Sequence, residues 1–245
     1  MSLPRCSEIG FQGVSKSFDG RKVLDDVSFA IPAGEALCLM GRSGTGKSVT
    51  LKLMIGLMRP DQGTICIENQ NIVPMDEDAL SNVRRKIGFL FQSAALFDSF
   101  SVNDNLALPL MRFSRKSEKE IDEIVQRQLD AVGLGDARYK MPAELSGGMR
   151  KRAGLARALV LEPSILLIDE PSSGLDRITA SEIDELLLGL KRKATMVIVT
   201  HDIRGARRVG DRLAVLEKGR LLAIGPAQEL EKNENELVRC LVSED

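Results

Sequence analysis

Gly41-Arg42-Ser43-Gly44-Thr45-Gly46-Lys47-Ser48 is the stretch of this 245-residue chain that decides its fold. It lies between an apolar strand-like run, Ala36 to Met40, and a helical pattern over Lys47 to Leu57. Glycines at this spacing let the backbone wrap a phosphate group, so that successive N–H groups and the helix N-terminus face its negative charge. Lys47 can then reach the β and γ phosphates, and the Ser48 hydroxyl can hold Mg²⁺. The stretch therefore predicts a strand–loop–helix unit that binds a nucleotide.

Short strands and helices alternate outward from this unit. Apolar, β-rich runs predict strands at Gly10–Val14, Val27–Ile31, Thr64–Ile67, Ile87–Leu90, Ile165–Ile168, Met196–Val199 and Leu213–Leu216. A helix among the later strands has apolar residues at i, i+3, i+4 and i+7, namely Ile183, Leu186, Leu187 and Leu190. Strands that alternate with helices predict an α/β fold with a parallel sheet covered on both faces.

Residues 93 to 160 have a helical character instead. Ser117 and Glu120 form a capping-box pair, followed by one apolar face made of Ile121, Ile124, Val125, Leu129 and Val132. This stretch predicts a helical insert in the α/β core. The last residues, Lys232 to Asp245, are expected to be a polar tail with one short apolar patch.

Composition limits the partners and the location. Lys and Arg number 34 against 35 Asp and Glu, a net charge of −1, so no global basic field favours nucleic acid and no nucleic-acid partner is expected. No apolar run approaches the roughly 20 residues that span a bilayer. The first ten residues lack the pattern of an export signal, so a cytosolic chain is expected. The four cysteines have no metal or redox spacing.

Acidic and imidazole side chains follow two of the later strands. Asp169 can hold Mg²⁺ directly or through water, and Glu170 can polarise an attacking water. The alternative is that both acids cap the following helix. His201 is the only histidine, and a neutral imidazole at the end of a strand can reach the γ-phosphate and the same water. Here the alternative is that Thr200 or Asp202 merely caps the next helix.

A second phosphate-binding turn is predicted further along the chain. Ser146-Gly147-Gly148 opens a helix, so its N–H groups offer a cradle that the loop at 41 to 48 does not need. Two cradles with a single Lys-bearing loop indicate that one nucleotide is gripped by two copies, each giving one half. The basic run Arg150-Lys151-Arg152 is interpreted as a solvated helix face, with added positive potential near phosphate as the alternative.

Leu145-Ser146-Gly147-Gly148-Met149, lying between the phosphate loop and the acidic pair, resembles the signature sequence of ABC-type ATPases. The resemblance covers nearly the whole chain. It implies a RecA-like P-loop NTPase core with an N-terminal antiparallel β-subdomain and a helical subdomain inserted at about 93–160. It further implies one ATP-binding domain over 5–241, a short tail at 242–245, and a homodimer that sandwiches ATP with Mg²⁺.

The resemblance also assigns roles to individual residues. Gln92 matches the Q-loop that reaches Mg²⁺ and the water, although a glutamine after a strand means little alone. Phe18 matches the aromatic that stacks on adenine, with core packing as the alternative. The roles so implied are nucleotide binding by Phe18, Gly41, Arg42, Ser43, Gly44, Thr45, Gly46, Lys47, Ser48 and Val49; catalysis by Glu170, His201 and Gln92; metal binding by Ser48, Gln92 and Asp169; and contact across the dimer by Ser146, Gly147, Gly148, Met149 and the D-loop residue Asp176.

Three positions depart from the family pattern. Met149 replaces the usual glutamine of the signature. Val49 lacks the hydroxyl that the family offers to the α-phosphate, although its backbone N–H remains. Arg177 stands where proline often follows the D-loop aspartate, which leaves the turn there open.

A narrower resemblance lies in residues 91–97 and 147–158, which look like the ATPase subunits of Mce and Mla lipid transporters. It implies a subunit on the cytoplasmic face of the cell membrane that powers transport of a phospholipid or sterol-like lipid. The implied partners are an integral-membrane permease docked around 93–115, an MCE-domain lipid-binding protein and a small regulatory subunit. The alternatives are another cargo such as an amino acid or lipoprotein, a non-transport ABC ATPase of DNA repair or translation, and a nucleotide-gated module that does not turn over.

Overall fold

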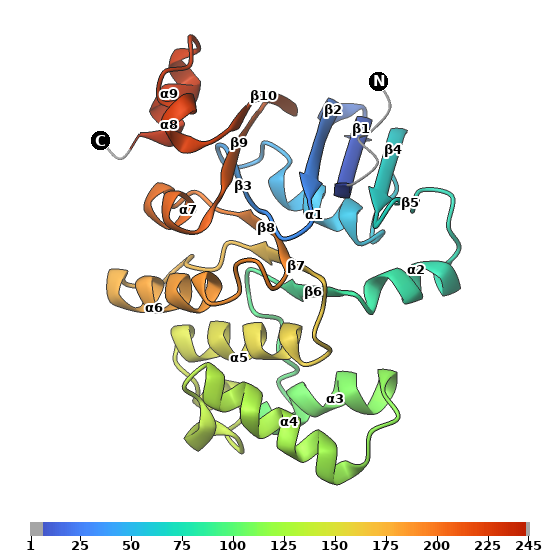
Figure 1. The fold of residues 1–245 in the computed structure, drawn as a ribbon, viewed down its shortest axis with the longest axis vertical. Coiled ribbons are helices and arrows are strands. Elements are labelled where there is room, and N and C mark those ends of the chain that lie inside the picture. The colour runs from blue at the N-terminus through green and yellow to red at the C-terminus, as the bar shows by residue number, and fades with distance from the viewer. Residues whose placement is uncertain (1–6, 244–245) are drawn as a thin grey trace.

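The computed structural model describes residues 7–243, so the expected domain start at residue 5 and the last two tail residues lie outside the described part. Its larger sheet has six strands in the order β10-β9-β3-β8-β7-β6 (Figure 1). Neighbouring strands from β9 to β6 are parallel, which confirms the predicted parallel sheet, and β10 adds an antiparallel edge. The strands are β3 (Ala36–Met40), β6 (Ile87–Leu90), β7 (Ile165–Asp169), β8 (Thr195–Val199), β9 (Arg212–Glu217) and β10 (Arg220–Gly225).

A second, antiparallel sheet lies over one face of the first and confirms the expected N-terminal β-subdomain. Its order is β2-β1-β4-β5, with bounds β1 (Ser7–Phe18), β2 (Arg21–Pro32), β4 (Gln62–Ile67) and β5 (Gln70–Asn71). Helix α1 (Lys47–Met54) packs between the sheets in one apolar core, where Phe11 and Phe29 stack with ring centroids 4.8 Å apart. Helix α1 ends earlier than the predicted Leu57 because Gly56 takes a left-handed φ of 64° and Leu57 turns outward.

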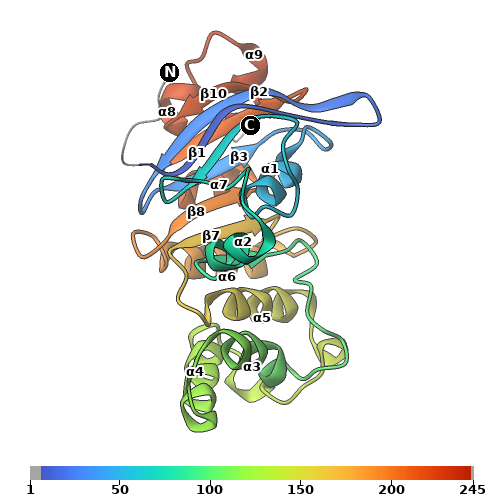
Figure 2. The same cartoon turned by 90° about the vertical axis from the view of Figure 1, so that its right-hand side faces the viewer.

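The helical insert forms one end of the molecule, as Figures 1 and 2 show. Its main helices are α3 (Val102–Phe113), α4 (Glu118–Ala131) and α5 (Gly147–Leu159), and the shorter α2 (Glu77–Arg84) precedes β6. The predicted capping box at α4 is present, because Ser117 N–H donates to Glu120 Oε2 at 2.8 Å and Glu120 N–H donates back to Ser117 Oγ. Helix α5 lies between the other insert helices and the large sheet, and apolar residues on two of its sides join two different cores.

The C-terminal helices cover the remaining face of the large sheet. They are α6 (Arg177–Leu188), α7 (Ile203–Val209), α8 (Ala227–Leu230) and α9 (Glu236–Val242). Helix α9 lies within the expected polar tail, and Val238 and Val242 of its apolar patch are fully buried against the core. Arg207 Nη1 donates to the Val242 carbonyl at 3.1 Å. Within residues 7–243, the structure contains no helix of sufficient length and apolarity to cross a membrane.

Candidate functional site

The phosphate loop joins the end of β3 to the start of α1, as predicted. Gly46 precedes α1 with no side-chain cap and no acidic residue in the first turn, so the N–H groups there are available to an anion. A Cβ atom on Gly41 would lie 2.1 Å from the Leu216 carbonyl oxygen, which is why glycine is needed there. Lys47 Nζ donates to the carbonyl oxygens of Gly41 at 2.8 Å and Arg42 at 3.0 Å. Burial lowers the pKa of this ammonium, while the charges of Glu170 and Asp169 act to raise it.

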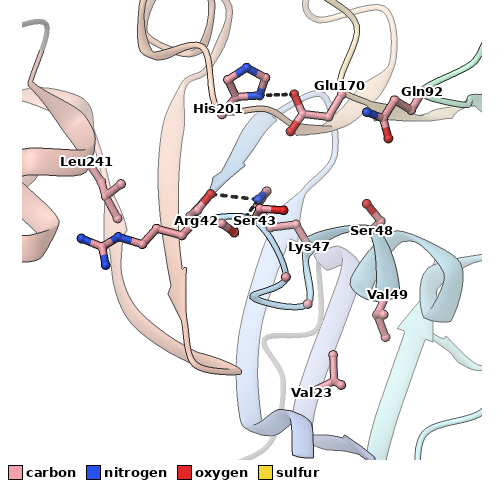
Figure 3. A pocket seen from close by; sticks show the side chains of 13 residues that line it. Val23, Arg42, Ser43, Lys47, Ser48, Val49, Gln92, Glu170, His201 and Leu241 are labelled. Atoms are coloured by element: carbon pink, nitrogen blue, oxygen red, sulfur yellow. Dashed lines mark hydrogen bonds and ion pairs between the residues drawn. The ribbon is translucent and has the colours of Figure 1, made fainter. Parts of the chain in front are cut away.

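A cavity of about 680 Å³ opens above this loop (Figure 3). Most of the residues predicted to bind the nucleotide or to act in catalysis line this cavity. The lining is Val23, Gly41, Arg42, Ser43, Gly44, Gly46, Lys47, Ser48, Val49, Gln92, Glu170, His201 and Leu241. Thr45 is buried and donates through Oγ1 to the Arg42 carbonyl at 2.9 Å, and Phe18 lies at the exposed end of β1, outside the lining. Val23 and Leu241 were not foreseen from the sequence.

Oxygen donors suited to Mg²⁺ meet beside the loop. Ser48 Oγ donates to Asp169 Oδ1 at 3.1 Å. Ser48 and Gln92 line the cavity, whereas Asp169 is buried behind Ser48 and is not part of the lining. Burial raises the pKa of Asp169, while Ser48 and the nearby lysine charges lower it. Among residues 7–243, no cluster of three His, Cys, Asp or Glu side chains could enclose a metal. The hydroxyl oxygen of Ser48 and the carboxylate of Asp169 are hard oxygen ligands, which fit a Mg²⁺ ion that takes its other ligands from phosphate and water.

Glu170 and His201 form a hydrogen-bonded pair at the carboxyl ends of β7 and β8. His201 Nδ1 lies 2.7 Å from Glu170 Oε2, and the dashed line in Figure 3 marks this contact. Glu170 has a left-handed φ of 49°, and its N–H donates to the Val199 carbonyl at 2.8 Å. The acids at 169 and 170 do not cap the next helix, because Asp176 caps α6. Asp202 does cap α7, and it does so alongside the His201 contact rather than in place of it.

The segment after Gln92 leads from the core into the helical insert. Ala94 and Ala95 both adopt left-handed φ values, 62° and 46°, which are uncommon for residues with a Cβ atom. Arg157 on α5 donates through Nη2 to the Ala94 carbonyl at 2.9 Å and through Nη1 to the Ala95 carbonyl at 2.8 Å. This clamp holds the segment in place two residues after Gln92.

The signature segment, residues 145–149, lies outside the cavity of its own chain. Ser146 caps α5 by accepting from Met149 N–H at 3.2 Å. A Cβ atom on Gly148 would lie 2.3 Å from Thr179 Cγ2, so glycine lets α5 approach α6 closely. Asp176, also outside the lining, accepts from the Thr179 N–H at 3.0 Å as the α6 cap, and Arg177 begins the helix without disturbing that turn.

The expectation that the basic run is a solvated helix face is wrong for Lys151. Its side chain is 6% exposed, and Nζ donates to the Glu170 carbonyl at 2.7 Å. Arg150 and Arg152 donate to other carbonyls, those of Leu145 at 2.7 Å and Val132 at 3.2 Å. The physical reason is that α5 is packed on two sides, so position 151 faces the sheet. The spacing of Gly148, Lys151 and Leu155, at i, i+3 and i+7, was the available signal.

The chain is similar to known ATP-binding proteins over most of its length. The family model described as ABC transporter matches residues 24–173. The chain is 45% identical over 246 residues to the probable ribonucleotide transport ATP-binding protein mkl of Mycobacterium tuberculosis, covering 96% of this chain and 68% of that protein. It is 40% identical to the methionine import ATP-binding protein MetN 2 of Pseudomonas entomophila, with coverages of 91% and 68%.

The chain is also similar to a protein named for phospholipid transport and to a solved dimeric ATP-binding cassette. The intermembrane phospholipid transport system ATP-binding protein MlaF of Escherichia coli is 37% identical, with coverages of 94% of this chain and 87% of that protein. The solved dimeric structure of the ATP-binding cassette MJ0796, in a post-hydrolysis state bound to ADP and Pi, superposes with a TM-score of 0.84 at 33% identity. It covers 89% of this chain and 98% of its own.

Proposed function

The chain belongs to the ABC transporter family as an ATP-hydrolysing subunit, and we propose that its transporter moves lipid across the cell envelope. The observation that carries the catalytic part of the proposal is the convergence of Lys47, Glu170 and His201 on one cavity. The lipid part is supported by residues 91–97 and 147–158, which resemble Mce and Mla ATPases, and by the likeness to MlaF, named for intermembrane phospholipid transport.

In this proposal the nucleotide binds along the phosphate loop. Backbone N–H groups from Gly41 to Val49 surround the phosphates, and Lys47 exchanges its two carbonyl partners for phosphate oxygens. Phe18 stacks on the adenine. Ser48, Asp169 and Gln92 would hold Mg²⁺, which neutralises phosphate charge when bound.

Hydrolysis then depends on the pair at the ends of β7 and β8. Glu170 acts as the general base that takes a proton from the attacking water, and its carboxylate is held by His201 at 2.7 Å. Gln92 and His201 position the water against the γ-phosphate.

We expect Glu170→Gln to bind ATP normally but to hydrolyse it about 10²-fold more slowly, because the general base is lost. Glu162→Gln is the control, because Glu162 also has a left-handed φ but is exposed and is not part of the cavity lining. Turnover of Glu170→Gln at nearly the wild-type rate would remove that residue from the role.

A second copy of the chain completes the site. Its Ser146, Gly147 and Gly148 N–H groups close over the γ-phosphate with Met149 beside them, and Asp176 links the two sites across the dimer. ATP binds the closed dimer better than the open one and so drives closure, which moves a permease docked around 93–115.

Ser146→Arg should leave nucleotide binding to the monomer unchanged and should block ATP-driven dimerisation, as measured by light scattering. An unchanged dimer population with ATP contradicts the sandwich.

The proposed complex lies on the cytoplasmic face of the cell membrane, with an integral-membrane permease, an MCE-domain lipid-binding protein and a small regulatory subunit. The decisive experiment is to isolate the intact complex from its native membrane and to identify the permease and the bound lipid. An amino-acid permease in place of the lipid partners would favour the cargo in the name of MetN 2 and overturn the lipid proposal.

A further inference from the structure

A buried lysine joins the signature helix to the backbone of Glu170. Lys151 lies in the second turn of α5, five residues after Ser146, and its side chain is 6% exposed. Its Nζ atom donates to the Glu170 carbonyl oxygen at 2.7 Å in a buried contact. No carboxylate within residues 7–243 lies close enough to form an ion pair with it, although the charges of Glu170 and Asp169 act to raise its pKa against the effect of burial.

Burying an ammonium group without an ion-pair partner is unfavourable, so this position needs a compensating reason. Several apolar side chains pack on the neighbouring faces of α5, and an apolar residue at 151 would avoid the cost of desolvating a charge. Within residues 7–243, the Lys151 ammonium donates to the backbone carbonyl of Glu170 and to no other protein acceptor. The hydrogen bond thus joins α5 to the residue that carries the proposed general base.

The Glu170 peptide needs outside support. Its left-handed φ of 49° is uncommon for a non-glycine residue and costs free energy unless its surroundings fix it. Its N–H donates to the Val199 carbonyl at 2.8 Å, and its own carbonyl accepts from Lys151 and, at 3.3 Å, from Ser173 N–H. Of these contacts, the Lys151 bond alone comes from the helical insert.

We propose that Lys151 is a positioning residue that fixes the Glu170 carboxylate relative to the signature helix, so that engagement of that helix by the partner's nucleotide sets the general base of its own subunit. The inference rests on the proposed roles of Glu170 and the signature segment. It adds a coupling between the two nucleotide sites of the dimer, which is carried by α5 and by the hydrogen bond from Lys151 to the Glu170 carbonyl. Because both ends of this connection are close-packed, a shift of α5 is transmitted to the Glu170 peptide.

The test is a double-mutant cycle between Lys151 and Glu170. Lys151→Met replaces the first four side-chain atoms with an unbranched apolar chain and removes the ammonium donor. We expect kcat to fall at least about tenfold, with the KM for ATP within about threefold, because the bond acts on chemistry rather than on binding. In the Glu170→Gln background the same substitution should change the residual single-turnover rate by less than about twofold, because the group that it positions is already gone.

Two further variants keep the test decisive. Arg152→Met also removes a cation–carbonyl hydrogen bond from α5, but to Val132, and its kcat should stay within about twofold of wild type. Lys151→Gln retains an amide donor without a charge; it should lose less activity than Lys151→Met and serves in the cycle if Lys151→Met does not fold, as judged by thermal unfolding.

The outcomes separate this inference from the function on which it rests. Fast hydrolysis by Glu170→Gln alone rejects the catalytic proposal. If Glu170→Gln is slow, then an equal loss from the substitution at 151 in both backgrounds, or no loss in either, rejects the positioning role. An Arg152→Met variant as slow as Lys151→Met would attribute the effect to packing of α5 and also rejects it.

Discussion

Asp184 on α6 is a buried carboxyl group whose charge should lower the stability of the protein near neutral pH. It is 9% exposed and lies under α7. Burial raises the pKa of Asp184 to about 6 from 3.8, aided by the negative charges of Asp202 and Glu185 and opposed by Arg208. We expect Asp184→Asn to stabilise the protein, because the amide has nearly the same shape and no charge to desolvate.

The magnitude follows from the difference between the two pKa values. A folded pKa of about 6 against 3.8 in the unfolded chain corresponds to about 3 kcal/mol of destabilisation at pH 8, where both states are ionised. Because the folded pKa is the higher one, the penalty shrinks as pH falls from 8 through 6 and disappears below 3.8. At pH 5 about half of it remains, or about 1.5 kcal/mol.

The assay is urea unfolding of wild type and Asp184→Asn at pH 8 and pH 5. The variant should gain up to about 3 kcal/mol at pH 8 and about half of that at pH 5. Glu182→Gln is the control, because this acid on the same helix is exposed and its neutralisation should change stability little. A gain that is equal at the two pH values, or no gain at pH 8, refutes the reasoning.

Two other predictions concern contacts of α5. Gly148→Ala places a methyl group 2.3 Å from Thr179 Cγ2, so we expect the free energy of unfolding to fall by about 1–3 kcal/mol and ATP-driven dimerisation to weaken. Adding Thr179→Ser removes the clashing methyl group and should restore part of both losses, as checked by thermal unfolding and light scattering. Arg157→Met removes both hydrogen bonds to the carbonyls of Ala94 and Ala95, so backbone amides at 93–97 should exchange hydrogen at least about tenfold faster, and unchanged exchange there contradicts the clamp.

Site and fold features that are encoded by short local motifs were predictable from the sequence. The phosphate loop, the polar residues after β7 and β8 and the α4 capping box each depend on neighbours within a few residues, and the structure has all of them. Asp169 ends β7, and His201 lies two residues past the end of β8. The parallel sheet also followed from local alternation, since crossover helices impose it.

Residues that depend on distant packing were not predictable in the same way. Val23 and Leu241 line one cavity although more than 200 positions separate them, and an isolated aliphatic residue carries no motif. Leu241 reaches the rim because Val238 and Val242 anchor α9, whereas the surrounding sequence is polar. Lys151 was assigned to solvent because charge is usually exposed, and only the placement of α5 between two cores buries it.

The Arg157 clamp on Ala94 and Ala95 has a thermodynamic consequence for the proposed transporter. Two residues of chain reach at most about 7 Å, so the link between Gln92 and the clamp has little slack to absorb a displacement of the insert. Any coupling that this link carries acts equally in both directions, because coupling free energies are reciprocal. If ATP binding shifts the permease between its states by a given factor, then holding the permease in one state must change the affinity of this cavity for ATP by that same factor.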